Sequence, residues 1–328
     1  MTDTRMTRAD VALRITIAVL TFRRPLDLAH GLPLVIDQAS GLAERVGRRF
    51  ATTVLVVDND PEGSAFRTVQ AVRERMTDPS VSLRYVVESK PGIPPARNRA
   101  IDESADDDLL AFIDDDERPD EHWLDSLVST WLRTRAAAVT GRVVSEFDGE
   151  LDEWVRAGQF FTRRSLPTGT RVRVGATSNL LLDRRRIAET GVRFDTTLRF
   201  GAGEDSLFCL ELGNRGGEIV WCQESIAIDR VPRARMSREW VLERARSHGN
   251  AEVVVDLRLV AGRSRQLVAR GKAIARGATR VAAGNARFAF GLATGSLRHQ
   301  ARGLRTARRG AGMAAGGVGV AYQEYARD

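Results

Sequence analysis

Residues 109–116 constrain the fold of this chain most strongly, because five apolar residues run directly into three aspartates. The apolar run, Leu109 to Ile113, has the length of a strand and no polar alternation, which is typical of a buried parallel strand. Charged side chains cannot continue inside such a sheet, so Asp114, Asp115 and Asp116 are expected where the strand emerges. In an open α/β sheet, ligands bind at the carboxyl ends of the strands.

Three adjacent carboxylates repel one another unless a cation is shared between them. A divalent metal ion carrying a diphosphate would meet this requirement. The alternative is a solvated acidic turn that leads into a helix, which the sequence predicts from Asp120 to Trp131. Both interpretations are open on the triplet alone.

Strands and helices alternate through the first part of the chain, which predicts a parallel α/β sheet with right-handed crossovers. Strands are expected at residues 15–20, 53–57, 83–87 and 109–113, and later at 138–144, 180–182 and 218–221. Helices are expected at 26–46, 64–75, 184–190 and 206–214, and one is expected to begin near residue 96. Gly31, Pro33 and Gly41 are expected to interrupt the first helix.

The usual phosphate-binding loops are missing. No G-x-G-x-x-G follows the first strand, and no G-x-x-x-x-G-K-[ST] occurs anywhere in the chain. These absences argue against a dinucleotide-binding or Walker-type site. A bound phosphate would therefore have to be held by a metal ion or by arginines.

Charge and cysteine content narrow the class of protein. Residues 257–328 carry 14 Lys/Arg against 2 Asp/Glu, whereas the remaining residues carry 36 against 41. The basicity thus belongs to the C-terminal region, and a nucleic-acid-binding function is not expected for the whole chain. The two cysteines, Cys209 and Cys222, indicate no disulfide framework, and a reducing compartment is expected. Neither a secretory leader nor a spanning helix is recognisable.

Seven short motifs follow one another along residues 14–250. They are Thr21-Phe22-Arg23-Arg24-Pro25, Val57-Asp58-Asn59, Ala96-Arg97-Asn98, Ile113-Asp114-Asp115-Asp116, Ser178-Asn179, Gly203-Glu204-Asp205, and Val231-Pro232 before Arg235. In this order and spacing the chain resembles glycosyltransferase family 2, whose members use nucleotide-sugar donors. The resemblance implies the α/β GT-A (Rossmann-like) fold, with a mixed, mostly parallel sheet flanked by helices. Residues 1–250 would form the catalytic domain, and residues 251–328 a basic, helical C-terminal extension.

The resemblance also implies a set of donor-binding residues. The nucleotide sugar would be bound by Thr21, Phe22, Arg24, Asp58, Arg97, Asp114, Asp115 and Asn179. Structural alternatives stand beside three of these roles. Asp58 is also suited to cap a turn, Arg97 is equally suited to be a solvated helix arginine, and Asn179 to be a turn residue at a strand edge.

A divalent cation, Mg²⁺ or Mn²⁺, is implied next to the donor diphosphate. Asp116 and Asp114 have the D-x-D spacing of its ligands, and the metal would neutralise charge on the departing nucleoside diphosphate. Many relatives have a histidine where this chain has Asp229. An aspartate can ligate a metal through oxygen; alternatively that contact is lost, and Arg230 or Arg235 meets the diphosphate.

The catalytic base is expected at Glu204-Asp205, which follows glycines and begins a helix. Transfer with inversion needs a base that takes the proton of the acceptor hydroxyl. The family places a carboxylate here, and Asp205 is predicted to be this base, with Glu204 orienting it or the acceptor. The structural alternative is simple capping of the helix.

The C-terminal region combines arginines with Leu, Val and Phe at loosely helical intervals, and glycines within it are expected to weaken any helix by about 1 kcal/mol each. Such helices can lie on an anionic membrane surface. The alternative is packing on the catalytic domain or on a second copy of the chain.

The expected function is therefore inverting transfer of a sugar, from a UDP-sugar in this prediction, to a hydroxyl of a glycan or lipid-linked acceptor at the cytoplasmic face of the membrane. Two other classes remain open. A sugar nucleotidyltransferase would share the sheet and acids but usually has a glycine-rich loop after the first strand, and residues 21–25 lack one. A non-catalytic scaffold would be expected to have lost the acids at 114–116 or 204–205.

Overall fold

The computed structural model describes residues 12–198, 201–320 and 322. The chain divides into two compact units, each of which is described by itself. The first unit consists of Met1–Val144, Arg163–Thr196 and Phe208–Asp229, and the second of Ser145–Thr162, Thr197–Leu207 and Arg230–Asp328. Within the second unit, the helix that begins at Arg238 packs with helices of the C-terminal region.

Within the described residues, nine strands form one sheet in the order β3-β2-β1-β4-β8-β6-β9-β5, with β7 paired to β9. Its parallel part consists of β3 (Val81–Val87), β2 (Phe50–Asp58), β1 (Leu13–Thr21) and β4 (Leu109–Asp114). Its antiparallel part consists of β8 (Leu180–Asp183), β6 (Ala138–Phe147), β9 (Ile219–Val231), β5 (Glu117–Pro119) and β7 (Arg171–Val172). The predicted mixed α/β sheet is confirmed.

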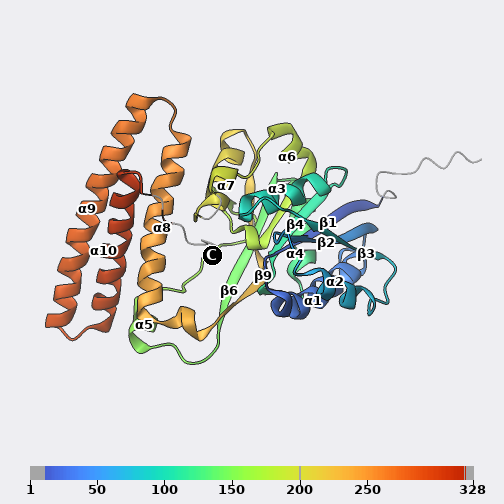
Figure 1. The fold of residues 1–328 in the computed structure, drawn as a ribbon, viewed down its shortest axis with the longest axis horizontal. Coiled ribbons are helices and arrows are strands. Elements are labelled where there is room, and N and C mark those ends of the chain that lie inside the picture. The colour runs from blue at the N-terminus through green and yellow to red at the C-terminus, as the bar shows by residue number, and fades with distance from the viewer. Residues whose placement is uncertain (1–11, 199–200, 321, 323–328) are drawn as a thin grey trace, which may run out of the picture. The chain divides into compact units, whose positions relative to one another are not determined.

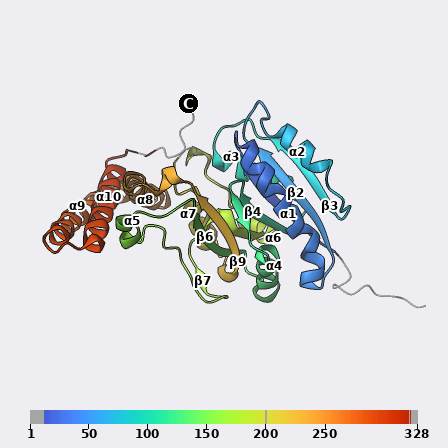
Figure 2. The same ribbon diagram turned by 90° about the horizontal axis from the view of Figure 1, so that it is seen from below.

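Helices cover both faces of the first unit's sheet, as Figures 1 and 2 show. One core contains α1 (Pro25–Val46), α2 (Phe66–Arg73) and α4 (Trp123–Thr134), together with strand residues Ile17, Val54 and Ala111. The other contains α3 (Ile93–Glu103), α6 (Arg184–Thr190) and the part of α7 (Glu204–Asn214) from Phe208 on, together with Ala18, Leu55 and Phe112. Strand side chains alternate between two apolar layers, which is why these strands carry no polar alternation.

The first helix was expected to be interrupted, but α1 is continuous over 22 residues. Its buried face includes Leu28, Leu32 and Val35, so tertiary packing outweighs the weak helix propensity of its glycines. Gly31 also has a positive role. A Cβ atom at Gly31 would lie 3.4 Å from the carbonyl oxygen of Asp115, so the missing side chain lets α1 lie close to the acidic turn.

The last strand was also predicted incorrectly in length. β9 extends over 13 residues to Val231, where the sequence predicted a strand that ended at Trp221. Its second half pairs with β5, and the two segments are more than a hundred residues apart in the chain. Pairing partners of this kind leave little periodic signal in a local window, because the strand is stabilised by a distant neighbour.

The second unit is helical. Its helices are α5 (Glu153–Gly158), α8 (Arg238–Leu259), α9 (Arg263–Ala293) and α10 (Leu297–Gly317). Short 3₁₀ turns occur at Thr196–Leu198 and Arg233–Met236, and another occurs in the first unit at Thr177–Asn179. α10 packs along both α8 and α9. A Cβ at Gly277 would lie 2.6 Å from the carbonyl oxygen of Gly310, and a Cβ at Gly284 would lie 2.7 Å from that of Gly303. These glycines therefore permit close backbone packing rather than only weakening the helices.

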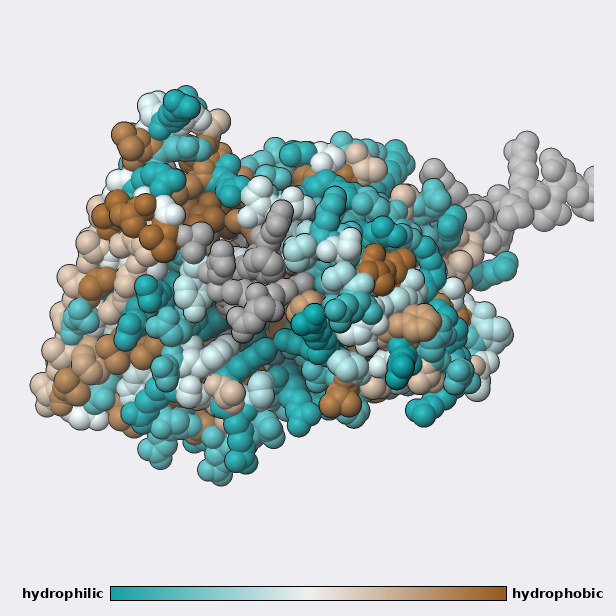
Figure 3. All heavy atoms as spheres, in the orientation of Figure 1, coloured by the Kyte–Doolittle hydropathy of each residue, from teal (hydrophilic) through white to brown (hydrophobic). Residues whose placement is uncertain are grey.

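α9 leaves large apolar side chains exposed. Leu267 is 72% exposed, Phe290 55% and Leu292 58%, and arginines such as Arg265 lie among them. The space-filling view shows hydrophobic side chains gathered over the C-terminal helices (Figure 3). In the part of the chain that the structure describes, no helix is both long and apolar enough to cross a membrane.

Candidate active site at the carboxyl edge of the sheet

Three strand ends bring the predicted donor-site residues of the first unit together. In the pairing of β1 and β2, Thr21 lies opposite Asp58, and in the pairing of β1 and β4, Leu20 lies opposite Asp114. The carboxyl ends of β1, β2 and β4 therefore meet at one edge of the sheet. This is the edge at which open α/β sheets bind ligands.

The acidic turn after β4 is partly buried and is held by one arginine. Asp115 is only 6% exposed, whereas the Asp116 side chain is 27% exposed. Arg24, which directly precedes α1, places its Nη1 atom 2.6 Å from Asp116 Oδ2 and 3.3 Å from Asp115 Oδ1. A guanidinium group thus provides a positive charge that two of the three carboxylates share.

Asp115 has a strongly perturbed pKa. Burial raises the pKa of its carboxyl to about 7, Arg24 and the nearby Thr21 side chain act in the opposite direction, and Asp116 and Asp114 raise it further. Its Oδ2 atom is buried and accepts no well-aligned hydrogen bond. An unsatisfied buried carboxylate oxygen is unfavourable in the absence of a cation or proton donor.

Glu117, the residue after the triplet, belongs to this site and was not predicted from the sequence. It begins β5 and is 7% exposed, and its Oε2 atom is buried without a hydrogen-bond partner. Burial raises the pKa of its carboxyl well above the usual range, and Asp114, Asp229 and Asp116 raise it further. Its position as a fourth consecutive acid was a signal, but its cross-strand neighbour could not be identified from the sequence.

Asp229, the residue at the position of a family histidine, lies in β9 directly opposite Glu117. Its carboxylate forms an ion pair with Arg163, whose side chain is 45% exposed. Asp229 therefore lies at the same edge as the acidic turn, and an arginine also provides its counter-charge here.

The donor set suits Mg²⁺ or Mn²⁺, because both prefer carboxylate oxygens and two of the oxygens here are orphaned. Among the described residues, however, no three His, Cys, Asp or Glu side chains are arranged to hold a metal ion. Arg24 and Arg163 are bound to the carboxylates that would be needed. Metal binding would thus require both arginines to release their partners.

Asp58 caps the turn that follows β2, which was the alternative to a nucleotide contact. It is fully buried, its Oδ1 accepts from the backbone N–H of Asp60 at 3.0 Å, and its Oδ2 accepts from the N–H of Ala65 at 2.8 Å. The hydroxyl of Tyr85 donates a third hydrogen bond at 2.9 Å. In this conformation Asp58 orders the loop that follows β2.

Asn179 is fully buried with its hydrogen-bonding capacity used inside the protein. Its Oδ1 accepts from Trp123 Nε1 and from the Ser225 hydroxyl, both at 3.0 Å. Its Nδ2 donates to the carbonyl oxygens of Arg142 and Ser225 at 3.0 and 3.1 Å. Asn179 therefore fixes β8 against its neighbours and has no hydrogen bond left for a donor sugar in this conformation. Here it acts as the turn residue at a strand edge that was the alternative to a donor contact.

Three further predicted donor contacts lie near this edge. Arg97 is 6% exposed, and its guanidinium lies 5.4 Å from the ring centre of Phe194. Thr21 is 4% exposed at the end of β1. Phe22 follows it, with the Arg23 guanidinium 5.2 Å from the Phe22 ring centre.

Glu204 and Asp205, the predicted catalytic carboxylates, belong to the second unit and form the first turn of α7. Glu204 is 6% exposed, and Asp205 is partly exposed. Gly203 before them has φ +106°, a backbone conformation that side chains rarely permit. The backbone N–H of Ser206 donates to Asp205 Oδ1 at 2.6 Å, which holds this carboxylate at the helix start. Of the pair, Asp205 is the one that solvent reaches more easily.

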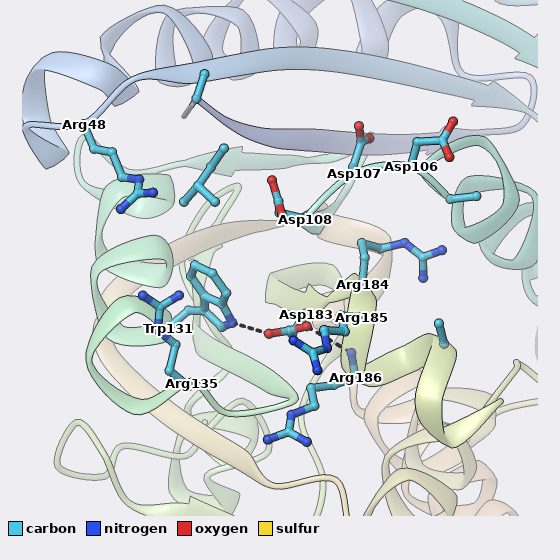
Figure 4. A pocket seen from close by; sticks show the side chains of 14 residues that line it. Arg48, Asp106, Asp107, Asp108, Trp131, Arg135, Asp183, Arg184, Arg185 and Arg186 are labelled. Carbon is cyan, nitrogen blue, oxygen red and sulfur yellow. Dashed lines mark hydrogen bonds between the residues drawn. The ribbon is translucent and has the colours of Figure 1, made fainter. Parts of the chain in front are cut away.

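A cavity in the first unit lies elsewhere. It has a volume of about 910 Å³ and is lined at the beginning of β1 and β4 by Leu13 and Asp108, among others (Figure 4). Its acids serve the fold: Asp183, for example, accepts hydrogen bonds from Trp131 Nε1 at 2.9 Å and from the N–H of Arg186 at 3.0 Å. None of the predicted site residues lines it.

Comparison with known proteins agrees with this architecture. The family model described as Glycosyl transferase family 2 matches residues 16–189. The succinoglycan biosynthesis protein ExoM of Rhizobium meliloti (strain 1021) is 35% identical over 232 residues, which cover 71% of this chain and 72% of that protein.

Solved structures show a similar fold. The mannosyltransferase PcManGT from Pyrobaculum calidifontis, in complex with GDP-Man and Mn²⁺, has a TM-score of 0.59 at 17% identity, covering 90% of this chain and 86% of that one. S. aureus TarS 1-349 in complex with UDP-GlcNAc has a TM-score of 0.52 at 11% identity, covering 91% and 92%. At these identities the two structures establish the fold alone.

Proposed function

The chain belongs to glycosyltransferase family 2, and we propose that it transfers a sugar from a nucleoside diphosphate donor, a UDP-sugar, to a hydroxyl of a glycan or lipid-linked acceptor. The observation that carries this proposal is the acidic turn at the carboxyl edge, with Asp115 buried and one of its oxygens orphaned. The name of ExoM supports a role in polysaccharide biosynthesis. The UDP-GlcNAc bound to TarS 1-349 and the GDP-Man bound to PcManGT support a nucleotide-sugar donor but differ in the nucleotide.

The proposed donor site combines the acids with Arg24. Asp114, Asp116 and Asp229 would hold Mg²⁺ or Mn²⁺, and the ion, when bound, neutralises charge on the departing nucleoside diphosphate. Arg24 would move from Asp116 to a phosphate oxygen, since a guanidinium binds both groups with the same geometry. Thr21, Phe22, Arg97, Asp58 and Asp115 would line the nucleotide and sugar.

The proposed chemistry is a single displacement with inversion. The acceptor hydroxyl oxygen forms a bond to the anomeric carbon, and the bond from that carbon to the diphosphate oxygen breaks. Asp205 takes the hydroxyl proton, and Glu204 orients Asp205 or the acceptor. The partial exposure of Asp205 and the hydrogen bond from Ser206 support this division of roles, because the base must reach the acceptor from a fixed position.

Residues 1–250 form the catalytic domain in this proposal, and residues 251–328 attach it to the inner face of the cell membrane. The exposed Leu267, Phe290 and Leu292 of α9 support this attachment. An interfacial helix buries such side chains at the boundary of the acyl chains, while its arginines attract anionic lipid. Binding to anionic but not neutral vesicles is the expected result in a flotation assay, and flotation with neither would argue against it.

A donor panel tests the function directly. UDP-, GDP- and dTDP-sugars are added to the purified chain with Mn²⁺, and both the unfolding temperature and the release of nucleoside diphosphate are measured. A UDP-sugar is expected to give the largest stabilisation and the fastest release, and NMR of a transferred product should show the inverted anomeric configuration. No stabilisation by any donor, with or without Mn²⁺, would refute the proposal.

A further inference from the structure

We propose that Arg23 is a positioning residue for donor binding, which fixes the loop after β1 through its ion pair with Asp60. This inference rests on the proposed function, because Phe22 and Arg24, the two neighbours of Arg23, are donor contacts in that proposal. Arg23 itself acts without touching the donor. Neither the proposed donor site nor the likeness to known proteins assigns a role to this residue.

The backbone of Arg23 has a conformation that needs support. Its φ is +52°, in the left-handed region that a side chain disfavours. Among the described residues, two other non-glycine residues, Arg135 and Gln159, have a positive φ, and both lie at the C-cap of a helix, where this conformation is common. Arg23 instead follows a strand and precedes α1, so no helix end explains its conformation. Such a residue persists where the surrounding structure holds it in place.

An ion pair with the loop after β2 provides this support. Arg23 Nε lies 3.1 Å from Asp60 Oδ2, and the Asp60 side chain is only 2% exposed. Asp60 is fixed in turn, because its backbone N–H donates to Asp58 Oδ1 at 3.0 Å and its Oδ1 accepts from the backbone N–H of Glu62 at 3.3 Å. Arg23 is therefore bound to a hydrogen-bonded part of the β2 loop. Any other shape of the loop after β1 would leave the Asp60 carboxylate buried without its arginine, which is unfavourable.

Two successive arginines join the loop after β1 to the loops on both sides of it. In the sheet, β1 lies between β2 and β4. Arg23 pairs with Asp60 in the loop after β2, whereas Arg24 pairs with the acidic turn after β4. The Arg23 guanidinium also lies 5.2 Å from the ring centre of Phe22. Arg23 therefore contributes to the positions of both of its neighbours, Phe22 and Arg24.

This support matters most when Arg24 changes its partner. In the proposed donor complex, Arg24 leaves Asp116 for a phosphate oxygen, so the link between its loop and the acidic turn is lost. The ion pair of Arg23 with Asp60 does not depend on the donor, because Asp60 is buried among protein groups. It therefore continues to hold the loop at that stage. Without this pair, donor binding would also have to order the loop, and this cost lowers affinity.

Calorimetric titration with UDP in the presence of Mn²⁺ tests the proposal. Arg23→Ala is expected to weaken UDP binding about tenfold, the factor that corresponds to the cost of one left-handed residue. Arg23→Lys should recover most of the affinity, because a lysine can still pair with Asp60. Arg14→Ala is the matched control, since Arg14 lies at the other end of β1 and forms an ion pair of similar exposure, 57% against 55%. Unchanged UDP affinity in Arg23→Ala, or an equal loss in Arg14→Ala, would overturn the proposal.

Two further variants separate positioning from a direct contact with the donor. Arg23→Gly removes the guanidinium but enters the left-handed region without a steric cost, so it is expected to retain more UDP affinity than Arg23→Ala. An equal loss in both would indicate that the guanidinium contacts the donor, against the proposal. Asp60→Asn changes a buried side chain and should also weaken UDP binding. Its combination with Arg23→Ala should add little further loss, because both variants break the same pair, and additive losses would count against the pair.

Amide exchange of the nucleotide-free chain tests the ion pair without a donor. The backbone N–H of Asn59 donates to the Thr21 carbonyl oxygen at 2.8 Å, which joins the two loops. This amide is expected to exchange faster in Arg23→Ala and at the unaltered rate in Arg14→Ala. Unchanged exchange in Arg23→Ala would overturn this inference alone. A chain whose exchange follows the expectation but which binds no UDP, GDP or dTDP would instead contradict the proposed function.

Discussion

Substitution of Asp115 by Asn is predicted to stabilise the metal-free protein at alkaline pH. Asp115 is 6% exposed, and burial raises the pKa of its carboxyl from the ordinary value of 3.8 to about 7. The folded chain therefore holds this proton more tightly than the unfolded chain does. The protonated Asp115 carboxyl therefore contributes stability that is fully present below about pH 4 and is lost as the pH rises through about 7.

The size of the effect can be worked out from the same shift. One pKa unit corresponds to about 1.4 kcal/mol, so a rise from 3.8 to about 7 corresponds to roughly 4 kcal/mol at pH 8. The Asn side chain does not ionise, so the Asp115→Asn chain does not lose this free energy at pH 8. The attraction between Asp115 and Arg24 is already contained in this shift, because it is one of the causes that set the pKa at about 7. The net stabilisation at pH 8 is therefore roughly 4 kcal/mol.

Urea unfolding in the presence of EDTA provides the assay, with both chains measured at pH 4.5 and pH 8. The advantage of Asp115→Asn is expected to be about 1 kcal/mol or less at pH 4.5 and to grow to several kcal/mol at pH 8. Glu121→Gln, which changes an exposed carboxylate, should show no comparable growth. An Asp115→Asn chain that is less stable at pH 8, or a difference that does not depend on pH, would refute the reasoning.

Three further predictions concern catalysis and packing. Asp205→Asn is expected to lower transfer at least about a thousandfold while donor binding by calorimetry stays near that of the unaltered chain, because only the base is lost; retained turnover would contradict it. Asp116→Ala is expected to make donor binding insensitive to Mn²⁺, and a variant whose binding still falls on addition of EDTA would show that the metal lies elsewhere. Gly310→Ala should lower the unfolding temperature by an amount equivalent to about 1–3 kcal/mol, because its Cβ would lie 2.6 Å from the carbonyl oxygen of Gly277. Gly271→Ala, with open space around it, should instead stabilise α9 by up to about 1 kcal/mol, and equal effects of the two would contradict the packing argument.

The family, the fold and the edge of the sheet that carries the acids were predictable from the sequence. Residues 109–113 have no polar alternation because both faces of β4 are covered, and an uncovered face would have shown as a polar residue at every second position. The aspartates after this run could lie only at the end of the strand. Local sequence was sufficient here, because the apolar run and the aspartates that follow it lie within the same few residues.

Other features depend on residues far apart in the chain. Glu117 joins the site through its pairing with Asp229, and neither short segment indicates that register. Asn179 has the residue type of a ligand contact, but Trp123 and Ser225 use its hydrogen bonds from other elements. The glycines of α9 and α10 looked destabilising because propensity describes an isolated helix, whereas Gly277 and Gly310 act through their contact with each other.

The acidic turn shows how instability at a site can serve function. Two buried carboxylates, of Asp115 and Glu117, each have an orphaned oxygen, and burial raises the pKa of both. A protein selected only for stability would replace such groups, because neutral residues of the same shape avoid the loss. The arginines at Asp116 and Asp229 compensate part of this charge, and their side chains remain 41% and 45% exposed. Exposed arginines can exchange their carboxylates for phosphate oxygens at little cost, whereas the buried acids can be satisfied only by a small cation or a proton. The turn is therefore expected to bind a divalent ion and an anionic donor together more tightly than either one alone. A metal ion on the carboxylates would free the arginines to bind the donor phosphates, and phosphates on the arginines would free the carboxylates to bind the metal ion.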